Sequence, residues 1–163
     1  MQWVQMRQMG QMGQMGHLVG QLNQSPSVWG SKLWEVLHAI GSRSGRSPAK
    51  LQRDELRELQ WIVDNLETII PCKECRTHVE EYRKLTPPPE IWASDYDQWF
   101  WNFHEAVNTR LGKVGVSFAE YKLQNKQKVI ESWKEFARVV KIPATPLKGF
   151  ERHLRLWMGF AGI

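Results

Sequence analysis

The only two cysteines of this 163-residue chain, Cys72 and Cys75, lie three positions apart in the stretch IIPCKECRTH. A C-x-x-C pair has three common fates: half of a zinc site, a redox-active disulfide, or two buried apolar residues. Pro71 favours the first turn of a new helix, so the pair is predicted at a helix start. There the helix dipole and free N–H groups favour a thiolate and lower the thiol pKa. Helical spacing of three also puts the Cα atoms about 5 Å apart, close enough for a disulfide.

A zinc site needs four ligands, of which Cys72, Cys75 and His78 would provide three and His38 or His104 the fourth. The chain has no second C-x-x-C and no H-x-x-x-H motif, so the spacing for zinc is incomplete. A thioredoxin-like site would need flanking strands, which the pattern does not predict. The pair alone therefore leaves zinc binding and thiol redox chemistry equally open, with the inert alternative behind them.

The rest of the chain shows helical periodicity and no sustained alternation of period two. We predict helices from residue 26 or 27 to Gly41, over 48–69, from Pro71 to the prolines at 87–89, and over 95–111, 125–140 and 149–160. Gly112 is expected to cap the fourth of these. The predicted fold class is all-α: a four-helix bundle with a short fifth helix and a helical C-terminal extension.

Composition narrows the possible functions. The net charge is +5 and the pI 9.4, but basic and acidic residues alternate without a run of four cations, so nucleic-acid binding is not expected. No apolar run reaches the length of a membrane span, and the N-terminus lacks the features of a signal or transit peptide. Nine tryptophans are unusual for this length and predict a tryptophan-rich core or flat walls around an aromatic cofactor.

The chain divides into three predicted parts. Residues 1–27, with the repeat QMGQMGQMG at 8–16, are predicted to be a flexible, low-complexity arm. Residues 28–121 are predicted to form the functional domain, and residues 122–163 the helical C-terminal extension.

Two further stretches decide between zinc and redox chemistry. They are WGSKLWEVLH at 29–38 and WFWNFHEAVNTRLGK at 99–113. Together with Pro71-Cys72-x-x-Cys75 they resemble the Erv/ALR family of FAD-linked sulfhydryl oxidases. That family carries G-x-x-x-W-x-x-L-H, Y-P-C-x-x-C and W-x-x-x-x-H-N-x-V-N-x-x-L-x-K, in this order. The order and the intervals match over residues 29–121.

The resemblance implies FAD at the helix ends, with the Cys72–Cys75 disulfide beside the isoalloxazine and no metal ion. By position, the flavin would be lined from the first helix by Gly30, Lys32, Trp34 and His38. The adenine, ribose and phosphates would be held by His104, Val107, Asn108, Leu111 and Lys113. Either Phe118 or Tyr121 would supply an aromatic ring against the adenine.

The sequence departs from the family pattern in places. Ile70 replaces the tyrosine before the proline, and Glu105 replaces the asparagine after the histidine, adding negative charge near an anionic cofactor. The additional cysteines of cellular relatives are absent. This minimal form resembles the oxidases of large cytoplasmic DNA viruses, which implies the host cytoplasm or the virion rather than the mitochondrial intermembrane space.

The resemblance also implies a mechanism and partners. A substrate thiolate attacks Cys72, expected to be the more accessible sulfur, and Cys75 passes two electrons to the flavin. Molecular oxygen reoxidises the flavin and becomes hydrogen peroxide. Expected substrates are dithiol proteins, either thioredoxin-like or with an exposed C-x-x-C, and a homodimer through the first two helices is expected. The alternatives are a zinc-binding, non-enzymatic helical interaction module and a basic nucleic-acid binder.

Overall fold

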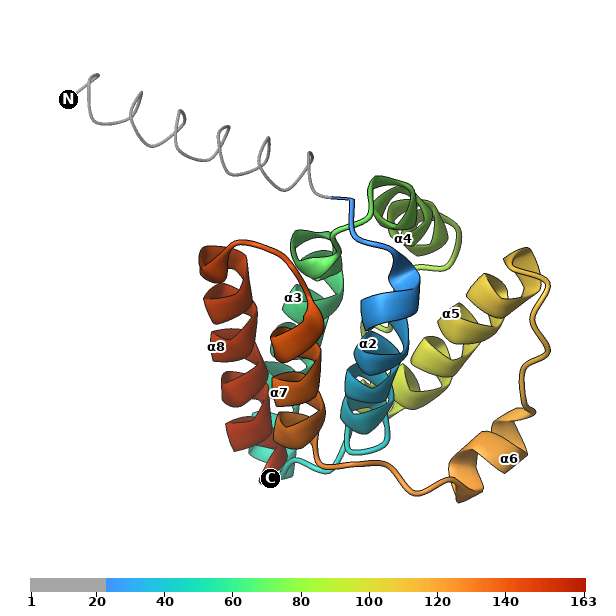
Figure 1. Ribbon diagram of the computed structural model, residues 1–163. Coiled ribbons are helices and arrows are strands. Elements are labelled where there is room, and N and C mark those ends of the chain that lie inside the picture. Colours follow the sequence, from blue (N-terminus) through green and yellow to red (C-terminus); the bar gives the residue numbers. More distant parts are fainter. Residues whose placement is uncertain (1–22) are drawn as a thin grey trace.

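The computed structural model of the protein describes residues 23–163. In this range it contains seven α-helices, three short 3₁₀ helices and no strand, which confirms the predicted all-α class (Figure 1). The α-helices are α2 (Pro26–Gly41), α3 (Gln52–Asp64), α4 (Lys73–Leu85), α5 (Tyr96–Arg110), α6 (Phe118–Leu123), α7 (Val129–Val139) and α8 (Ala144–Ala161). The 3₁₀ helices are η1 (Ala49–Leu51), η2 (Leu66–Ile69) and η3 (Ala93–Asp95). None of the helices between residues 23 and 163 is both long and apolar enough to cross a membrane.

The boundaries of α4 and α5 follow from their capping residues. Cys72 is the N-cap of α4, so Pro71 precedes the cap and does not lie in the first turn as expected. Helix α5 ends as predicted before Gly112, which takes a positive φ of 67°. The Gly112 amide donates to Thr109 O (3.2 Å) and the Lys113 amide to Asn108 O (2.8 Å), which is a Schellman motif. This turn sets where Lys113 leaves the helix.

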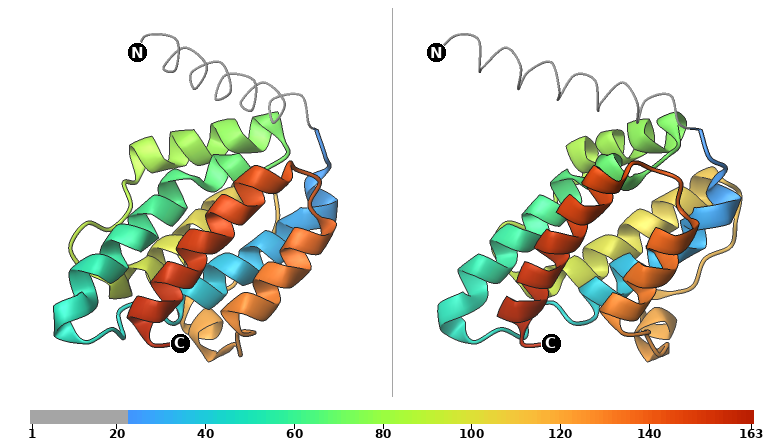
Figure 2. Two further views of the ribbon diagram at one scale, coloured as in Figure 1. Left: turned by 90° about the vertical axis from the view of Figure 1, so that its left-hand side faces the viewer. Right: turned by 60° about the vertical axis from the view of Figure 1, so that its left-hand side comes forward.

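One apolar core joins six of the seven helices in the described range, α6 being the exception. The four helices expected for the bundle are α2 to α5, but α7 packs along α2 and α8 along α3 (Figures 1 and 2). The side chains that these two helices bury most completely are Trp133, Phe136, Phe150, Leu154 and Trp157. The C-terminal helices are therefore part of the core and not an appendage to it.

A buried carboxylate fixes α8 in place. Glu55 of α3 is 0% exposed, and its Oε1 accepts from the Gly45 amide (2.8 Å) and from the Trp157 indole (3.3 Å). Its other oxygen accepts from the Ser47 hydroxyl. A buried carboxylate is tolerated only when hydrogen-bonded, so these donors hold α3, α8 and the loop after α2 together.

Gly41 allows α2 to approach α5 closely. A Cβ at this position would lie 2.9 Å from Asp97 Cα and 3.1 Å from a Phe100 ring carbon. Gly41 was expected only as the residue that closes the helix. Its φ is not positive, so close packing and not a left-handed turn accounts for the glycine.

Residues 23–27 belong to the folded part of the chain, although the sequence assigned them to the flexible arm. The Gln24 amide donates to Pro71 O (2.9 Å), directly before the cysteine pair. The Gln24 side chain donates to Val139 O (2.9 Å) and accepts from the Lys141 amide (2.7 Å). Helix α2 itself begins at Pro26. The remaining residues of the predicted arm, 1–22, lie outside the described residues.

Two glycine substitutions should have opposite effects on stability. Gly41→Ala should lower the free energy of unfolding by about 1–3 kcal/mol, because its Cβ meets the backbone of α5. Gly149→Ala should raise it by up to about 1 kcal/mol, because Gly149 lies within α8 and its Cβ would enter open space. Urea unfolding of both variants measures the difference. Equal effects of the two substitutions would contradict the packing assigned to Gly41.

Candidate active site

The two cysteines form a disulfide at the start of α4. Their Cα atoms are 5.2 Å apart, and the Cys75 amide donates to Cys72 Sγ at 3.3 Å. The N-cap sulfur thus takes the place of the oxygen that usually accepts from the third residue of a helix. Since the chain has no other cysteine, it has no free thiol in this state. Both sulfurs bind each other, and residues 23–163 contain no cluster of three or more His, Cys, Asp or Glu arranged to hold a metal ion.

Exposure of the two cysteines differs from the expectation. Cys72 is only 7% exposed, whereas Cys75 is partly exposed. Cys72 was expected to be the more accessible because it comes first on the helix. The prediction was wrong for this structure. The segment before α2 packs beside the start of α4, where the Gln24 amide donates to Pro71 O. Helix position alone does not show what the preceding segment covers.

A cavity of about 1110 Å³ opens beside the disulfide. Sites for small molecules usually span roughly 300–1,000 Å³, so this cavity suits a large ligand. Its wall runs from residues 23–27 and the cysteines, along α2 and α5, to the linker at residues 124–127. Figure 1 shows the start of α2 next to α4, and α6 near the other end of α2.

Three rings from α2 and α5 form the middle of the cavity wall. The Trp34 indole stacks on the His104 imidazole, with ring centroids 4.1 Å apart and planes 9° apart. His38 Nε2 and His104 Nδ1 share a hydrogen bond of 2.8 Å. The spacing of four between Trp34 and His38 puts both on one face of α2, where α5 presents His104. The result is a flat aromatic surface inside the cavity.

Burial keeps these imidazoles neutral. It lowers the pKa of His38 to about 3, with smaller contributions from His104 and Lys126. Burial also lowers the pKa of His104, which Glu105 partly opposes. The Nδ1 atoms of His38 and His78 are buried and have no hydrogen-bond partner among the described residues. The protein alone therefore leaves one hydrogen-bonding position of each ring unused.

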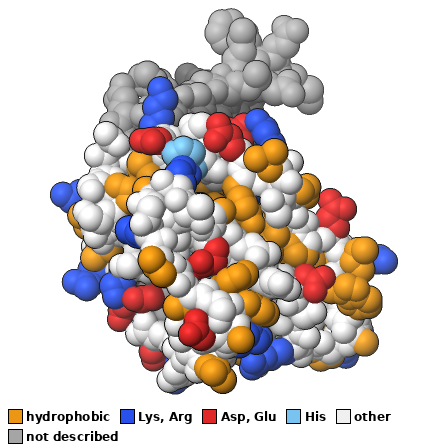
Figure 3. Space-filling view, turned by 90° about the vertical axis from the view of Figure 1, so that its right-hand side faces the viewer, with side chains coloured by type: hydrophobic (Ala, Val, Ile, Leu, Met, Phe, Trp, Pro, Cys, Tyr) orange, Lys and Arg blue, Asp and Glu red, His pale blue; other side chains and the backbone are white. Residues whose placement is uncertain are grey.

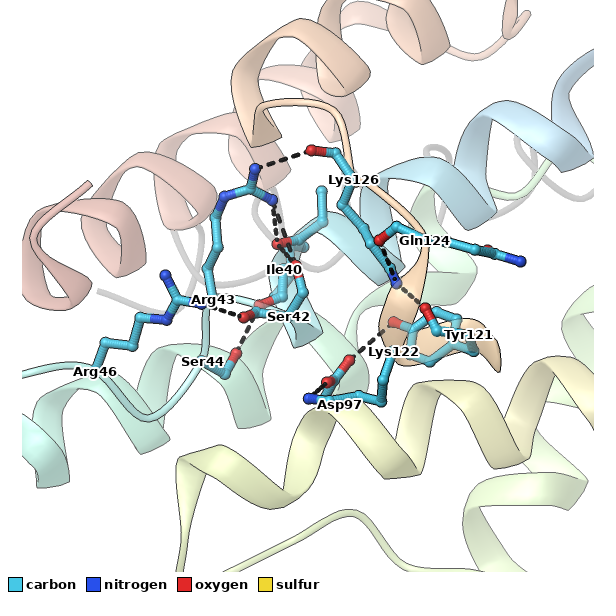
Figure 4. A network of polar contacts seen from close by, with 11 residues as sticks. Ile40, Ser42, Arg43, Ser44, Arg46, Asp97, Tyr121, Lys122, Gln124 and Lys126 are labelled. Carbon is cyan, nitrogen blue, oxygen red and sulfur yellow. Dashed lines mark hydrogen bonds and ion pairs between the residues drawn. The ribbon is translucent and has the colours of Figure 1, made fainter. Parts of the chain in front are cut away.

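A polar network, drawn in Figure 4, includes Tyr121, Gln124 and Lys126 of the cavity lining. The buried Asp97 carboxylate accepts from the Tyr121 hydroxyl (2.8 Å) and from Lys122 Nζ (2.7 Å). Burial and the bond to Asp97 raise the pKa of Tyr121, so its hydroxyl stays protonated. Lys126 Nζ lies 3.8 Å from the centre of the Tyr121 ring and donates to the Tyr121 and Gln124 carbonyls. Arg43 holds this linker to the end of α2 by donating to Lys126 O (3.1 Å).

The structure brings most of the residues expected from the sequence around this one cavity. Its lining includes Cys72, Cys75, Gly30, Trp34, His38, His104, Val107, Asn108, Leu111, Lys113 and Tyr121. Lys32 and Phe118 are not among the lining residues. Lys32 Nζ pairs with Glu135 of α7 at 3.1 Å, and Phe118 packs against the Trp101 ring, so Tyr121 is the better placed of the two aromatic candidates.

The mouth of the cavity combines charged and apolar side chains. The Asn108 side-chain amide donates to Glu105 Oε1 at 3.2 Å. Glu105 is the residue that replaces the asparagine of the family pattern, and this hydrogen bond gives its carboxylate a partner. Leu111 is 55% exposed and Val114 99% exposed, and both line the cavity. Figure 3 shows this side of the molecule, where hydrophobic side chains lie between acidic and basic ones.

Sequence reasoning missed several residues of the site. Gln24 crosses the loop before the cysteines, and Lys126 enters the cavity from the linker after α6. Asp97 of α5 accepts a hydrogen bond from the Tyr121 hydroxyl and so holds the Tyr121 ring in place. None of the three lies in a recognisable motif, and each depends on contacts between segments distant in sequence. His78 was noted only as a zinc ligand, although its spacing of three from Cys75 was a usable signal.

Comparison with known proteins gives a consistent picture. A model of the Erv1 / Alr family matches residues 31–134. The "FAD-linked sulfhydryl oxidase" of African swine fever virus (isolate Warthog/Namibia/Wart80/1980) is 31% identical over 104 residues, covering 64% of this chain and 85% of that protein. The "FAD-linked sulfhydryl oxidase ERV1" of Oryza sativa subsp. japonica is 36% identical over 84 residues, covering 52% of this chain and 42% of that protein. No solved structure matches the chain.

Stability should fall on acidification because of His38. Folded His38 stays neutral down to a pKa of about 3, whereas its ordinary value is 6.5. Between these values the unfolded chain holds more protons, so the free energy of unfolding decreases as the pH falls below about 6.5, by at most about 1.4 kcal/mol per pH unit for this residue. Urea unfolding at pH 7.5 and pH 5 measures the decrease, which His38→Asn should reduce. The same decrease in both proteins would rule out His38 as its source.

Proposed function

The chain belongs to the Erv1/Alr family, and we propose that it is a FAD-dependent sulfhydryl oxidase, which forms disulfides in thiol substrates and reduces oxygen to hydrogen peroxide. The observation that carries this proposal is the placement of the Cys72–Cys75 disulfide on the wall of an aromatic-lined cavity. A disulfide and a large flat-walled site, side by side, are what electron transfer from thiols to a flavin requires.

The residues of the cavity fit FAD. The stacked Trp34 and His104 rings provide a flat surface for an aromatic ring system. The buried, unpartnered Nδ1 of His38 needs a hydrogen-bond partner, which a polar ring edge can provide. Lys113 and Lys126 bring positive charge suited to a pyrophosphate. Glu105 opposes an anionic ligand, but its carboxylate already accepts from Asn108.

Thiol–disulfide exchange at α4 explains how these residues act. A substrate thiolate forms a bond to one sulfur of the pair, the Cys72–Cys75 bond breaks, and the other sulfur leaves as a thiolate. A second substrate thiolate then completes the substrate disulfide and leaves both cysteines reduced. The start of α4 stabilises the developing negative charge through its N–H groups and dipole. Bound FAD supplies the two-electron acceptor that restores the disulfide and delivers the electrons to oxygen.

We assign the attack by substrate to Cys72 and the contact with the flavin to Cys75. Cys75 is the partly exposed member and lies one helical turn into α4, on the cavity wall. Both sulfurs line the cavity, and Cys72 is the one whose preceding residue, Pro71, is bonded to the segment at residues 23–27. Attack on Cys72 then requires residues 23–27 to move away from it, because Cys72 is only 7% exposed.

The proposed substrates are proteins that present an exposed, flexible pair of cysteines. The two cysteines of the disulfide are the only ones in this sequence, so no further pair within it can relay electrons. A substrate must bring its thiols to the start of α4 itself. A thioredoxin-like protein or an exposed C-x-x-C meets this requirement, whereas a buried pair does not.

The expected homodimer stays a prediction, and α7 and α8 cover one face of each helix expected to form it. The resemblance placed the contact on the first two helices, and here α7 packs on α2 and α8 on α3. Trp133 is 1% exposed and Trp157 0% exposed in these contacts. Pairing through the same faces would require both helices to leave, which would expose a large apolar area to water. A dimer through α2 and α3 would therefore use the faces that α7 and α8 leave uncovered.

Substitution of either cysteine tests the proposed activity. Cys72→Ser and Cys75→Ser should each abolish oxygen consumption with a small dithiol, because exchange needs both sulfurs. Both variants should keep FAD, because the cavity wall comes mostly from α2 and α5. Oxygen consumption and the flavin absorbance of purified protein measure the two properties. Purified protein without flavin, or undiminished turnover in either variant, would refute the proposal.

Substitution of Lys113 tests the cofactor site. Lys113→Ala should weaken FAD binding by about 1–3 kcal/mol, the value of a charge-assisted contact. Lys148→Ala is the matched control, because it removes a lysine exposed on α8, outside the cavity. Flavin retention during gel filtration and the Tm of the holoprotein should fall only for Lys113→Ala. Equal retention in the two variants would exclude Lys113 from the site.

A further inference from the structure

His78 and Cys75 both contribute to the wall of the cavity. Both side chains come from α4, three residues apart, and both line the cavity. Residues at this spacing are neighbours on one helix face, with Cβ atoms about 5–6 Å apart. Long side chains in a helix point back toward its N-terminus, and a His78 imidazole in this orientation would extend toward the turn that carries Cys75.

The imidazole of His78 is incompletely bonded in the disulfide state. Its Nδ1 is buried and has no hydrogen-bond partner in residues 23–163. An unpartnered buried nitrogen destabilises the state in which it occurs. The neighbouring disulfide cannot satisfy it well, because a neutral sulfur is a weak acceptor. Opening the disulfide changes this, because it leaves a full negative charge on one sulfur.

Few other groups can balance a charge on Cys75. Arg76 follows it directly, but its guanidinium donates to Ile70 O at 2.8 Å. Lys73 is exposed at the first position of α4 and is absent from the cavity wall. The other charged or titratable residues on that wall are Glu35 and His38 of α2, Glu74 of α4, His104, Glu105 and Arg110 of α5, and Tyr121 of α6, with Lys113 and Lys126 from the linkers. Glu74, the acidic residue that α4 contributes to this wall, would disfavour a negative charge on Cys75.

We propose that His78 is a catalytic residue of the oxidase, which binds the Cys75 sulfur when the disulfide opens and holds a proton beside it. This inference rests on the proposed function and adds a residue that its motifs do not include. The unpartnered Nδ1 obtains a charged acceptor, and the Cys75 thiolate obtains a donor from the protein itself.

The proton and electron balance of the step is as follows. One substrate thiol loses its proton and bonds through sulfur to Cys72, while the Cys72–Cys75 bond breaks and its electron pair stays on Cys75. The proton resides on His78, so an imidazolium–thiolate pair forms. The second substrate thiol loses its proton to Cys72 as the substrate disulfide closes. The substrate has then lost two electrons and two protons, and the cysteine pair with His78 has gained them.

The ionisation of Cys75 can be measured without turnover. Cys72→Ser leaves Cys75 as the single thiol of the chain, and the rate of its alkylation by iodoacetamide across pH reports its ionisation. His78→Gln in this background should move the midpoint of the rate profile about one pH unit higher, since a nearby cation is removed. The rate at pH 7 should fall several-fold. Proteins are compared at equal flavin content.

Thr77→Ala in the same background is the matched control. Thr77 is exposed on the same helix, and its hydroxyl only bonds Lys73 O (3.2 Å). Its midpoint should not move. An unchanged midpoint for His78→Gln overturns the proposal, as does a change only in Tm or flavin content, which a structural role would produce. His78→Asn repeats the measurement where the glutamine variant folds poorly.

Activity of the otherwise intact chain separates the two proposals. His78→Gln with both cysteines present should oxidise a small dithiol at least about tenfold more slowly, because it lacks the proton-holding group. If the wild-type chain oxidises no thiol while the alkylation midpoint still depends on His78, the proposed function and the catalytic role of His78 both fail, and only the interaction of His78 with the Cys75 thiolate stands. If the wild-type chain oxidises the dithiol and the alkylation midpoint does not depend on His78, the proposed function stands and only the role of His78 fails.

Discussion

Helix α2 has to be buried on two sides at once, and the rest of the structure depends on this constraint. One side meets α5 so closely that Gly41 leaves no room for a Cβ, and this contact aligns the rings of Trp34, His38 and His104. The other side is apolar and needs a cover, which α7 provides. The cavity and the core therefore share one helix. A change in the packing of α2 on either side would shift the rings that it contributes to the cavity.

The redox end of the site is held by segments from both ends of the described chain. The disulfide lies at the start of α4, where the Cys72 sulfur caps the helix. Gln24 binds the preceding carbonyl of Pro71 and, through its side chain, the backbone at Val139 and Lys141 after α7. The C-terminal helices thus take part in shaping access to Cys72, although they contribute no residue with redox chemistry.

Burial gives the cavity its electrostatic character. Neutral imidazoles at His38 and His104, a protonated Tyr121 on a buried Asp97, and Lys126 above its ring combine hydrogen-bonding groups with limited charge. Such a wall can hold an aromatic cofactor without the repulsion that several cations in a small volume would cause. The unpartnered nitrogens of His38 and His78 mark where the protein alone leaves hydrogen bonds incomplete.

The sequence by itself determined the all-α class, the order of the predicted helices and the place of the cysteine pair at a helix start, because helical periodicity, proline and glycine signals and the C-x-x-C spacing are local properties. It also indicated most of the cavity wall, since the motifs of α2 and α5 set which side chains share a face. Only the tertiary structure decided the position of Gln24, the pairing of Lys32 with Glu135 and the covering of α2 and α3 by α7 and α8. These features join segments roughly 100 residues apart, and an amphipathic pattern shows that a helix has an apolar face without showing which partner covers it.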